Sequence, residues 1–336
     1  MADAPQTLSL IVAAQEYRDP IVRQINRRAT LLRLIPIRRG AGPACSLVAE
    51  ADGMVGENFS EGADVSNYGS DAQASGTQAW GHYRANFRVS GLARAVANSL
   101  GTPSGNIQLW ARNLVNASAK LAATINAGCH TGAGTGTLIA GAGVAIGSTS
   151  NIYYGIDRTS ATYWQPYVVD PGVDTAPTLK QIRGDLGTIY DSSGEVPDIA
   201  VVPTAVFTKL VSLFEPNVRW VKELNTARGL VTLESGYEGI SIDGCSFFKD
   251  KDAAAGTIEY WNTNHVSLEY LPPEGVPEDF QRMETANDGY GDFPLGFAYE
   301  LIAKTGDSRK AMVKSYCQLK VSRPNACGMR KHVLTT

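Results

Sequence analysis

The sequence predicts an α+β fold in which a compact part made of helices and strands follows a first part that cannot fold alone. Three observations predict this. Residues 1–37 offer little apolar surface, residues 40–78 form a long polar stretch, and helix and strand patterns alternate from residue 177 onward. The 336 residues are 43% hydrophobic and 19% charged, which suits a folded protein with a substantial core.

The N-terminal segment is predicted to be helical and then extended. Asp19 is a suitable N-cap and Pro20 suits the first helical position. Ile21 and Ile25 fall on one face of that helix, and an extended stretch follows from Leu31 to Ile37. Because this segment is too poor in apolar residues to fold alone, we expect an arm that lies on another surface.

A long β-hairpin is predicted next. Apolar and polar residues alternate from Cys45 to Asp52 and again from Tyr83 to Ser90, which is typical of strands. The residues between them are rich in Gly, Ser, Asn, Asp and Glu. An isolated hairpin is at best marginally stable in water, so we expect this one to rest on another subunit.

A long helix is predicted after the hairpin. Pro103 marks its start, apolar residues recur at three- and four-residue steps from Ile107 to Ile125, and Gly128 is expected to end it. The segment from Gly128 to Gly147 contains seven glycines, and we interpret it as a flexible linker. The aromatic residues 151–170 favour strands.

The second half of the chain alternates helix with strand. Leu179 to Ile189 carry an apolar stripe in a helix that should close near Gly194, a short buried strand is expected at Ile199–Val202, and Pro203–Thr204 opens another helix. Later strands are predicted at 257–261, 265–270, 296–303 and 311–321.

The net charge of −3 hides strong segregation. Residues 1–40 carry a net charge of +4, residues 41–80 hold six acids and no base, and no acid occurs from 72 to 156. Residues 159–307 carry −13, and residues 308–336 hold seven bases and no acid. Such blocks suggest surfaces that meet partners of opposite charge, although solvated faces would explain them equally well.

Motifs for chemistry are weak throughout. The glycines around Gly132–Gly136 do not match GxGxxG and follow a helix rather than a strand, so a nucleotide site is disfavoured. Asp250 and Asp252 could hold a cation, but a solvated turn is favoured, and the adjacent pair Cys129–His130 is a poor nucleophile and base.

The cysteines and the apolar runs of the sequence exclude further classes of protein. The five scattered cysteines suit buried free thiols better than disulfides or zinc. No apolar run is long enough to span a bilayer, so no membrane contact is expected. We therefore predict no enzyme activity, no catalytic residue, no cofactor and no metal.

The order of these elements resembles the coat-protein fold first described for phage Hong Kong 97. Three segments are similar to that family: Tyr154–Arg158 with Tyr163–Trp164, Pro197–Pro203, and Gln318–Pro324 with Ala326 and Gly328. The resemblance covers nearly the whole chain. It implies that the chain is a major capsid protein of a tailed bacteriophage.

The resemblance also implies a division of the chain into named parts. Those parts are an N-terminal arm at 1–37, an extended loop at 38–90, a peripheral domain at 91–164 with a spine helix at 103–127, an axial domain at 165–255, and a return to the peripheral domain with closing strands at 256–336.

The implied function is self-assembly into pentamers and hexamers of an icosahedral shell around phage DNA. The chain would be made in the host cytoplasm and end in the virion. Its partners would be many copies of itself, separate scaffolding, portal and cement proteins, and DNA contacted without base specificity. The alternatives are an encapsulin-type compartment shell, or an α/β nucleotide-binding enzyme that uses the glycine-rich segment.

Family relatives suggest two further expectations. Some carry a cleaved scaffolding domain ahead of the arm, which we do not expect here because the arm begins near residue 7. Some crosslink a loop lysine to a neighbouring asparagine, but no lysine precedes Lys120 in this chain, so we expect locking without covalent bonds.

The opposite charges of loop and arm give the candidate contacts between subunits. We expect acids of the loop in one subunit to meet arginines of the arm in a neighbour, although the acids could instead only keep the loop soluble. The candidate residues are Glu57, Glu61 and Asp64 on the loop and Arg23, Arg27, Arg28, Arg38 and Arg39 on the arm.

Overall fold

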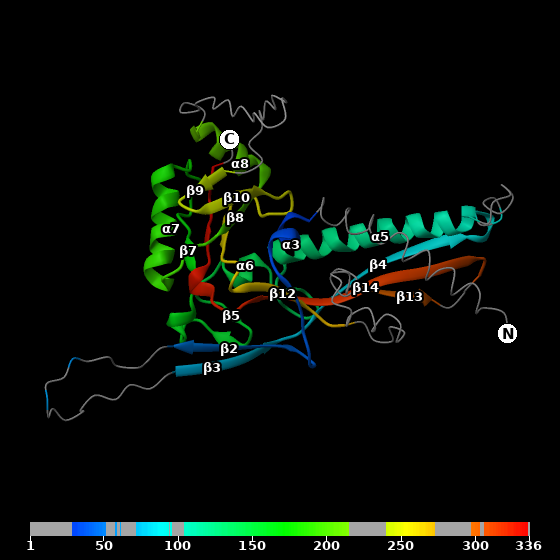
Figure 1. Ribbon diagram of the computed structural model, residues 1–336, viewed down its shortest axis with the longest axis horizontal. Coiled ribbons are helices and arrows are strands. Elements are labelled where there is room, and N and C mark those ends of the chain that lie inside the picture. The colour runs from blue at the N-terminus through cyan, green and yellow to red at the C-terminus, as the bar shows by residue number, and fades with distance from the viewer. Residues whose placement is uncertain are drawn as a thin grey trace, which may run out of the picture.

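The computed structural model combines two β-sheets with one long helix (Figure 1). It describes residues 29–51, 58, 61, 72–93, 95, 104–214, 240–272, 297–302 and 306–334. The predicted helix at Asp19–Pro20 and the strand residue Asp52 lie outside these ranges. The mixed helix-and-sheet architecture confirms the predicted α+β class.

The first sheet has five strands and forms the elongated part of the molecule. Its order is β1 (Ile37–Arg39), β12 (Val266–Tyr270), β14 (Ser308–Val321) and β13 (Ala298–Ile302), and β4 (Gly81–Ser90) also pairs with β14. Strands β4 and β14 are antiparallel over ten residue pairs, from Gly81 opposite Cys317 to Ser90 opposite Ser308. The predicted strands 265–270, 296–303 and 311–321 are therefore confirmed.

Helix α5 (Ser104–Thr131) lies along this sheet and confirms the predicted long helix, apart from its end. The prediction that Gly128 ends the helix was wrong. Gly128 lies inside α5, and a Cβ at that position would sit 2.7 Å from the hydroxyl oxygen of Tyr83. The glycine is thus required for close packing of helix against strand, not for a C-cap.

The second sheet has six strands in the order β7 (Tyr167–Val169), β15 (Gly328–Arg330), β11 (Ile258–Trp261), β8 (Ile199–Val202), β10 (Cys245–Lys249) and β9 (Ile240–Ile242). Helix α7 (Leu179–Ser193) ends at Gly194 in the left-handed region, as predicted, and α8 (Thr204–Phe214) follows β8. All residues of β8 and β11 are buried. Strand β8 is apolar throughout because it lies in the middle of the sheet, whereas β11 also carries the buried Glu259.

The hairpin forms with a different partner from the one predicted. Strand β2 (Cys45–Ala51) pairs with β3 (Ala72–Gln78), a segment that we assigned to the polar loop, while the strand from Tyr83 joins β14 instead. The apolar side chains of β4 form a partly buried face against α5. A strand that packs on a helix buries more apolar surface than a strand in a free hairpin can. Strand β4 therefore pairs with β14 beside α5 and not with β2.

The residues before β1 also differ from the prediction. Residues Thr30–Leu34 form a short helix, α3, rather than an extended stretch. Ala29, Leu31, Leu32 and Ile35 are buried in the main hydrophobic cluster. This end of the arm therefore packs on the core of its own chain.

The glycine-rich segment is packed, so its interpretation as a flexible linker was wrong. Ala133 bridges to Ala140, residues Ile139, Ala140 and Ala142 are fully buried, and the short helix α6 (Ala142–Ala145) follows. A Cβ on Gly132 would lie 2.2 Å from the carbonyl oxygen of Ile139. The glycines thus allow the chain to fold back tightly against the end of α5.

Three short elements complete the connection between the sheets. Strands β5 (Ile152–Tyr153) and β6 (Ile156–Asp157) form a small ribbon, and the 3-10 helix η1 (Thr162–Trp164) follows them. A second 3-10 helix, η4 (Pro324–Ala326), links β14 to β15. The larger hydrophobic cluster joins the first sheet to the second sheet, through Val201 and Trp261, and it also includes Tyr153, Tyr154 and Trp164. A second cluster packs α7 and α8 on the second sheet.

Candidate assembly surfaces and the polar joints behind them

The hairpin has one buried face and one exposed face. Cys45, Leu47 and Ala49 of β2 point inward, whereas Val48 is 57% exposed and Glu50 also faces solvent. Strand β3 contacts β6, and β2 contacts η1. The hairpin is therefore attached along one face only, and its opposite face is free to meet another molecule.

A close backbone contact fixes the hairpin on the body. A Cβ on Gly76 would lie 1.7 Å from the carbonyl oxygen of Tyr154, a distance that no side chain can adopt. The Tyr154 hydroxyl donates a hydrogen bond to the Cys45 sulfur at 3.1 Å, and Cys45 in turn lies 3.0 Å from Glu269. Burial raises the pKa of Cys45 to about 12, so this thiol stays protonated and serves packing.

The ribbon formed by β4 and β14 carries bases on the face opposite α5. Arg84 lies directly opposite Lys314, and Arg88 lies directly opposite Lys310. Like charges opposite each other on paired strands destabilise a sheet, so the local structure alone does not favour this arrangement. On the strands β4, β13 and β14, Glu300 is the one acid, and it forms an ion pair with Lys314 at 3.1 Å.

The other face of the ribbon is apolar and packs on α5. The rings of Phe87 and Trp110 meet edge to face with centroids 5.0 Å apart. The Trp110 indole donates a hydrogen bond to the Tyr299 hydroxyl of β13 at 2.9 Å. This packing fixes which side chains of β4 and β14 point away from the helix, and therefore holds the four bases on one surface.

A buried ionic cluster joins α5 to the second sheet and to α3. His130 lies 2.8 Å from Glu259 and 3.3 Å from Asp250, and all three side chains are almost fully buried. Burial alone would lower the pKa of His130, but the charge of Glu259 and hydrogen bonds to both carboxylates raise it to about 10. Asn126 and the backbone N–H of Leu31 also donate to Asp250.

A second buried ion pair ties α7 to β15. Arg330 binds Asp185 through two hydrogen bonds of 2.6 and 2.5 Å. The hydroxyls of Tyr167 and Tyr260 donate to the same carboxylate at 2.9 and 3.0 Å. Such a fully bonded carboxylate fixes the helix on the sheet, because removing Arg330 would leave the buried charge of Asp185 without a cation.

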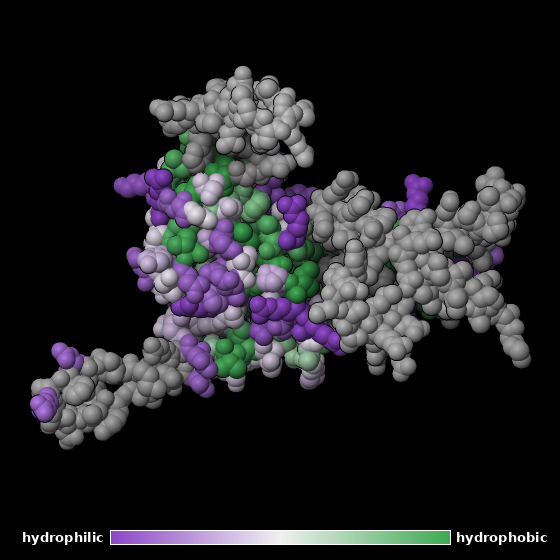
Figure 2. All heavy atoms as spheres, viewed as in Figure 1, coloured by the Kyte–Doolittle hydropathy of each residue, from purple (hydrophilic) through white to green (hydrophobic). Residues whose placement is uncertain are grey.

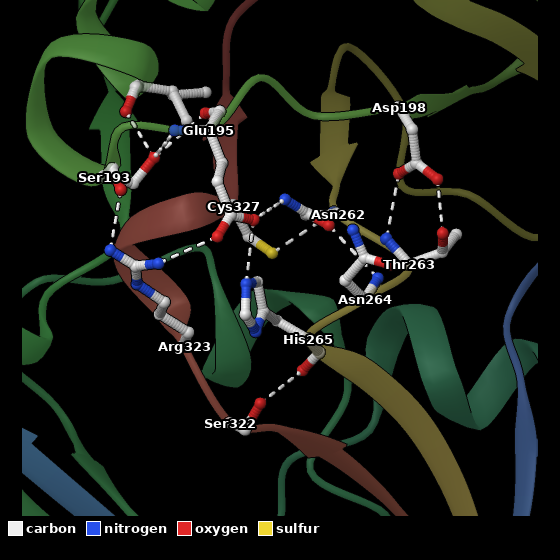
Figure 3. A network of polar contacts seen from close by, with 11 residues as sticks. Ser193, Glu195, Asp198, Asn262, Thr263, Asn264, His265, Ser322, Arg323 and Cys327 are labelled. Carbon is white, nitrogen blue, oxygen red and sulfur yellow. Dashed lines mark hydrogen bonds and ion pairs between the residues drawn. The ribbon is translucent and has the colours of Figure 1, made fainter.

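A partly exposed network joins the α7–β8 connection to the ends of β12 and β14 (Figure 3). Glu195 accepts hydrogen bonds from Arg323, His265 and Asn262 at 2.8 to 2.9 Å. These donors lower the pKa of Glu195 although its burial acts in the opposite direction. Arg323 also donates to the carbonyl of Ser193. Together with the His130 cluster, this network joins the second sheet to α5 and to the strands of the first sheet.

Arg158, in one of the segments that carry the family resemblance, has a purely structural environment. Its side chain is fully buried and donates to the carbonyls of Val144, Ala145 and Ser148. The guanidinium also lies over the ring of Tyr153 at 4.8 Å. Burial lowers the pKa of Arg158 to about 10, so it stays charged at neutral pH and caps the end of α6.

The structure describes three of the eight residues proposed for contacts between subunits. Arg38 and Arg39 lie on β1, an edge strand of the first sheet, and both are exposed. Glu61 is also exposed. Arg23, Arg27, Arg28, Glu57 and Asp64 lie outside the described residues. The bases Arg84, Arg88, Lys310 and Lys314 of β4 and β14 share one face of the sheet. The sequence indicated them only as members of two segments without acids.

The structure also shows the surroundings of the aspartates, the histidine and the cysteines that were considered as candidate chemical motifs. Asp250 is buried in the ionic cluster, so its assignment to a solvated turn was wrong. His130 faces carboxylates, and burial raises the pKa of Cys129 well above its usual value, which leaves an inert thiol. All five cysteines are free and buried, as predicted. Among the described residues no cluster suits a metal ion, and no helix could span a membrane.

Comparison with solved structures identifies the fold. The capsid asymmetric unit of cyanophage A-1(L) is similar with a TM-score of 0.68 and 16% identity, over 91% of this chain and 93% of that chain. The capsid of a native GTA particle gives a TM-score of 0.55 and 14% identity over 91% and 90%. The SrpI encapsulin of Synechococcus elongatus PCC 7942 gives 0.53 and 12% over 91% and 88%.

These similarities show that the chain has the phage coat-protein fold, as the order of its elements predicted. No family model and no curated protein sequence matches the chain. These three structures are 12–16% identical to this chain, a level that shows a common fold and no role for a particular side chain.

Proposed function

We propose that the chain is the major capsid protein of a tailed phage and that many copies build an icosahedral shell around phage DNA. The observation that carries this proposal is the hairpin β2–β3, which has one anchored face and one exposed face and lies at the border of the molecule (Figure 1). A hairpin of this kind gains stability when a neighbouring subunit covers it. The shared coat-protein fold supports the same conclusion.

The parts of the shell subunit follow from this proposal. Residues 1–37 act as the arm, although α3 packs on its own chain, and the loop within 38–90 is the hairpin β2–β3. Helix α5 with the first sheet forms the peripheral domain, including residues 91–164 and most of 256–336. The six-stranded sheet with α7 and α8 forms the axial domain, which includes most of 165–255 and surrounds the centre of pentamers and hexamers.

Exposed apolar side chains support an assembling subunit. Leu301 and Ile302 on the edge strand β13 are 49% and 40% exposed, and Ile152 is 65% exposed. Figure 2 shows hydrophobic surface among hydrophilic side chains over the compact part of the molecule. Single exposed apolar residues are ordinary, but adjacent ones on an unpaired edge favour contact with another protein.

An encapsulin-type compartment is the second candidate, because an encapsulin has the same fold. The phage capsid chain resembles this chain more strongly, with a TM-score of 0.68 against 0.53. The proposed virion location, the synthesis in the host cytoplasm, the lack of enzyme activity and the roles of scaffolding, portal and cement proteins all follow from the capsid proposal. The enzyme alternative loses support because the glycine-rich segment is packed rather than open.

The contents of purified particles distinguish a phage capsid from an encapsulin-type compartment. Particles purified from the native source should be treated with nuclease, opened, and analysed for DNA and protein. We expect protected double-stranded DNA inside. Particles that contain a cargo enzyme and no DNA would support the compartment instead.

A further inference from the structure

The polar network of Figure 3 joins three separate connections of the chain at one carboxylate. Glu195 follows the end of α7, His265 lies in the short connection from β11 to β12, and Arg323 lies just after β14. Glu195 Oε2 lies 2.9 Å from His265 Nε2, and Glu195 Oε1 accepts a hydrogen bond from Arg323 at 2.9 Å. The connections that carry the histidine and the arginine both pass from one sheet to the other. One acid therefore holds the end of α7 to two of the places where the chain crosses between the sheets.

The other ionisable groups around this site are already engaged or neutral. Asp198, on the same segment as Glu195, accepts hydrogen bonds from the backbone N–H and the hydroxyl of Thr263. Burial raises the pKa of Cys327 to about 12, so this thiol carries no charge. Among the residues that the structure describes here, Glu195 is the acid that the histidine and the arginine share.

We propose that Glu195, His265 and Arg323 form an acid-labile clasp, which opens when the Glu195 carboxylate takes up a proton. A neutral carboxyl group loses its attraction for both partners, and an imidazole is positively charged in acid. Protonation would thus leave two cations around an uncharged acid, and like charges repel. Because the buried Asp185–Arg330 pair keeps α7 on the second sheet, the opening is local to the two crossing connections.

The surroundings of Glu195 set the pH range in which the clasp acts. Burial would raise the pKa of Glu195, but the hydrogen bond and the charge of His265 act in the opposite direction. Asn262 and Arg323 add to this effect, so the pKa lies below its ordinary value of 4.5. The clasp therefore contributes its full stability above pH 4.5 and loses it as the pH falls through the lowered pKa.

The clasp is accessible to protons without unfolding of the core. The side chains of Glu195, His265 and Arg323 are 36%, 23% and 40% exposed. The inference goes beyond the proposed function, because the clasp lies within one chain and does not depend on assembly. In a shell it would be repeated in every subunit, so acid would loosen the link between the two sheets throughout the particle.

Hydrogen exchange of the full chain, measured by mass spectrometry and corrected for the intrinsic rate at each pH, tests the clasp. Protection of peptides that contain residues 262–265 and 322–327 should fall by up to about tenfold for each pH unit below that of the ordinary carboxyl group, because opening takes up one proton. Peptides of β8 should keep their protection, since this strand is buried in the middle of the second sheet.

Two variants assign the proton to one residue. Glu195→Gln should give low protection of the crossing connections in both neutral and acidic solution, with no step between them. The matched control is Glu300→Gln, which removes an acid from the ion pair with Lys314 on the first sheet. This control should keep the acid-dependent step.

Equal protection of the crossing connections in neutral and acidic solution in the original chain would overturn the inference. A step that survives in Glu195→Gln would also overturn it, because another acid would then take up the proton. If Glu195→Gln folds poorly, Arg323→Gln tests the same clasp. Loss of this cation should raise the pKa of Glu195 and move the step to higher pH, and a step that does not move would count against the clasp.

Discussion

Gly76 is the residue where the hairpin meets the body most closely. Replacing it with alanine would place a Cβ 1.7 Å from the Tyr154 carbonyl oxygen, so the hairpin or the β5–β6 ribbon must move. We expect a loss of roughly 1–3 kcal/mol in the free energy of unfolding, measured by denaturant titration. The control is Gly143→Ala, where nothing lies within 4 Å of the new Cβ. Equal stability of the two variants would contradict the close contact between Gly76 and Tyr154.

His130 makes the stability of the fold depend on pH. Its folded pKa of about 10 is higher than the usual 6.5, so its contribution is complete below pH 6.5 and is lost as the pH rises through 10. His130→Gln should lower stability by roughly 3–5 kcal/mol at pH 7 and flatten the curve between pH 7 and 10. His82→Gln, an exposed position on β4, should leave the curve unchanged. A curve that is unchanged in the His130 variant would refute this assignment.

Single residues also show the limit of sequence patterns. Gly128 carries the signal of a helix end, yet it lies inside α5 because Tyr83 approaches it. Asp185 and Arg330 are 145 positions apart, and no local pattern indicates that they form a buried pair. Periodicity reports which face is apolar, whereas contacts between distant residues depend on the complete fold.

At the scale of elements, α7 is held to the second sheet by the Asp185–Arg330 pair. Arg330→Met would leave the buried carboxylate without its cation and should cost roughly 3–5 kcal/mol of stability. The exposed pair Arg183–Asp243, with side chains 62% and 48% exposed, provides the control. Arg183→Met should cost less than about 1 kcal/mol in the same thermal or denaturant unfolding experiment. Equal losses would contradict the role assigned to burial.

The elements that the sequence predicted well are those with a strong apolar period. Helices α5, α7 and α8 and strands β8, β11, β12 and β14 occur where the patterns placed them. The hairpin pairing was wrong because β3, with the sequence AQASGTQ, has little apolar alternation. Residues 72–78 form a strand because they pair with β2, and the local composition does not indicate that pairing.

For the whole molecule, the sequence excludes one form of covalent locking. The chain has no lysine before Lys120, so the hairpin loop lacks the amine that an isopeptide crosslink requires. Mature particles boiled in detergent and reductant should give this protein as a single band at the mass of one chain on a gel. A ladder of higher multiples would show that another covalent bond joins the subunits.

The pairing of strands explains part of the charge segregation in the sequence. Two acid-free segments suggested shared surfaces, and the pairing of β4 with β14 brings them together. The sequence could not indicate which face the bases share, because that depends on the packing of Phe87 against Trp110. Residues 1–28 of the arm and the loop acids Glu57 and Asp64 lie outside the described residues, so their contacts stay predictions.

Electron microscopy of the purified chain tests the central claim most directly. A subunit of a shell should form closed polyhedral particles of uniform diameter, with subunits grouped in pentamers and hexamers. A homogeneous monomer or dimer that forms no particles across a range of salt and protein concentrations would contradict the account.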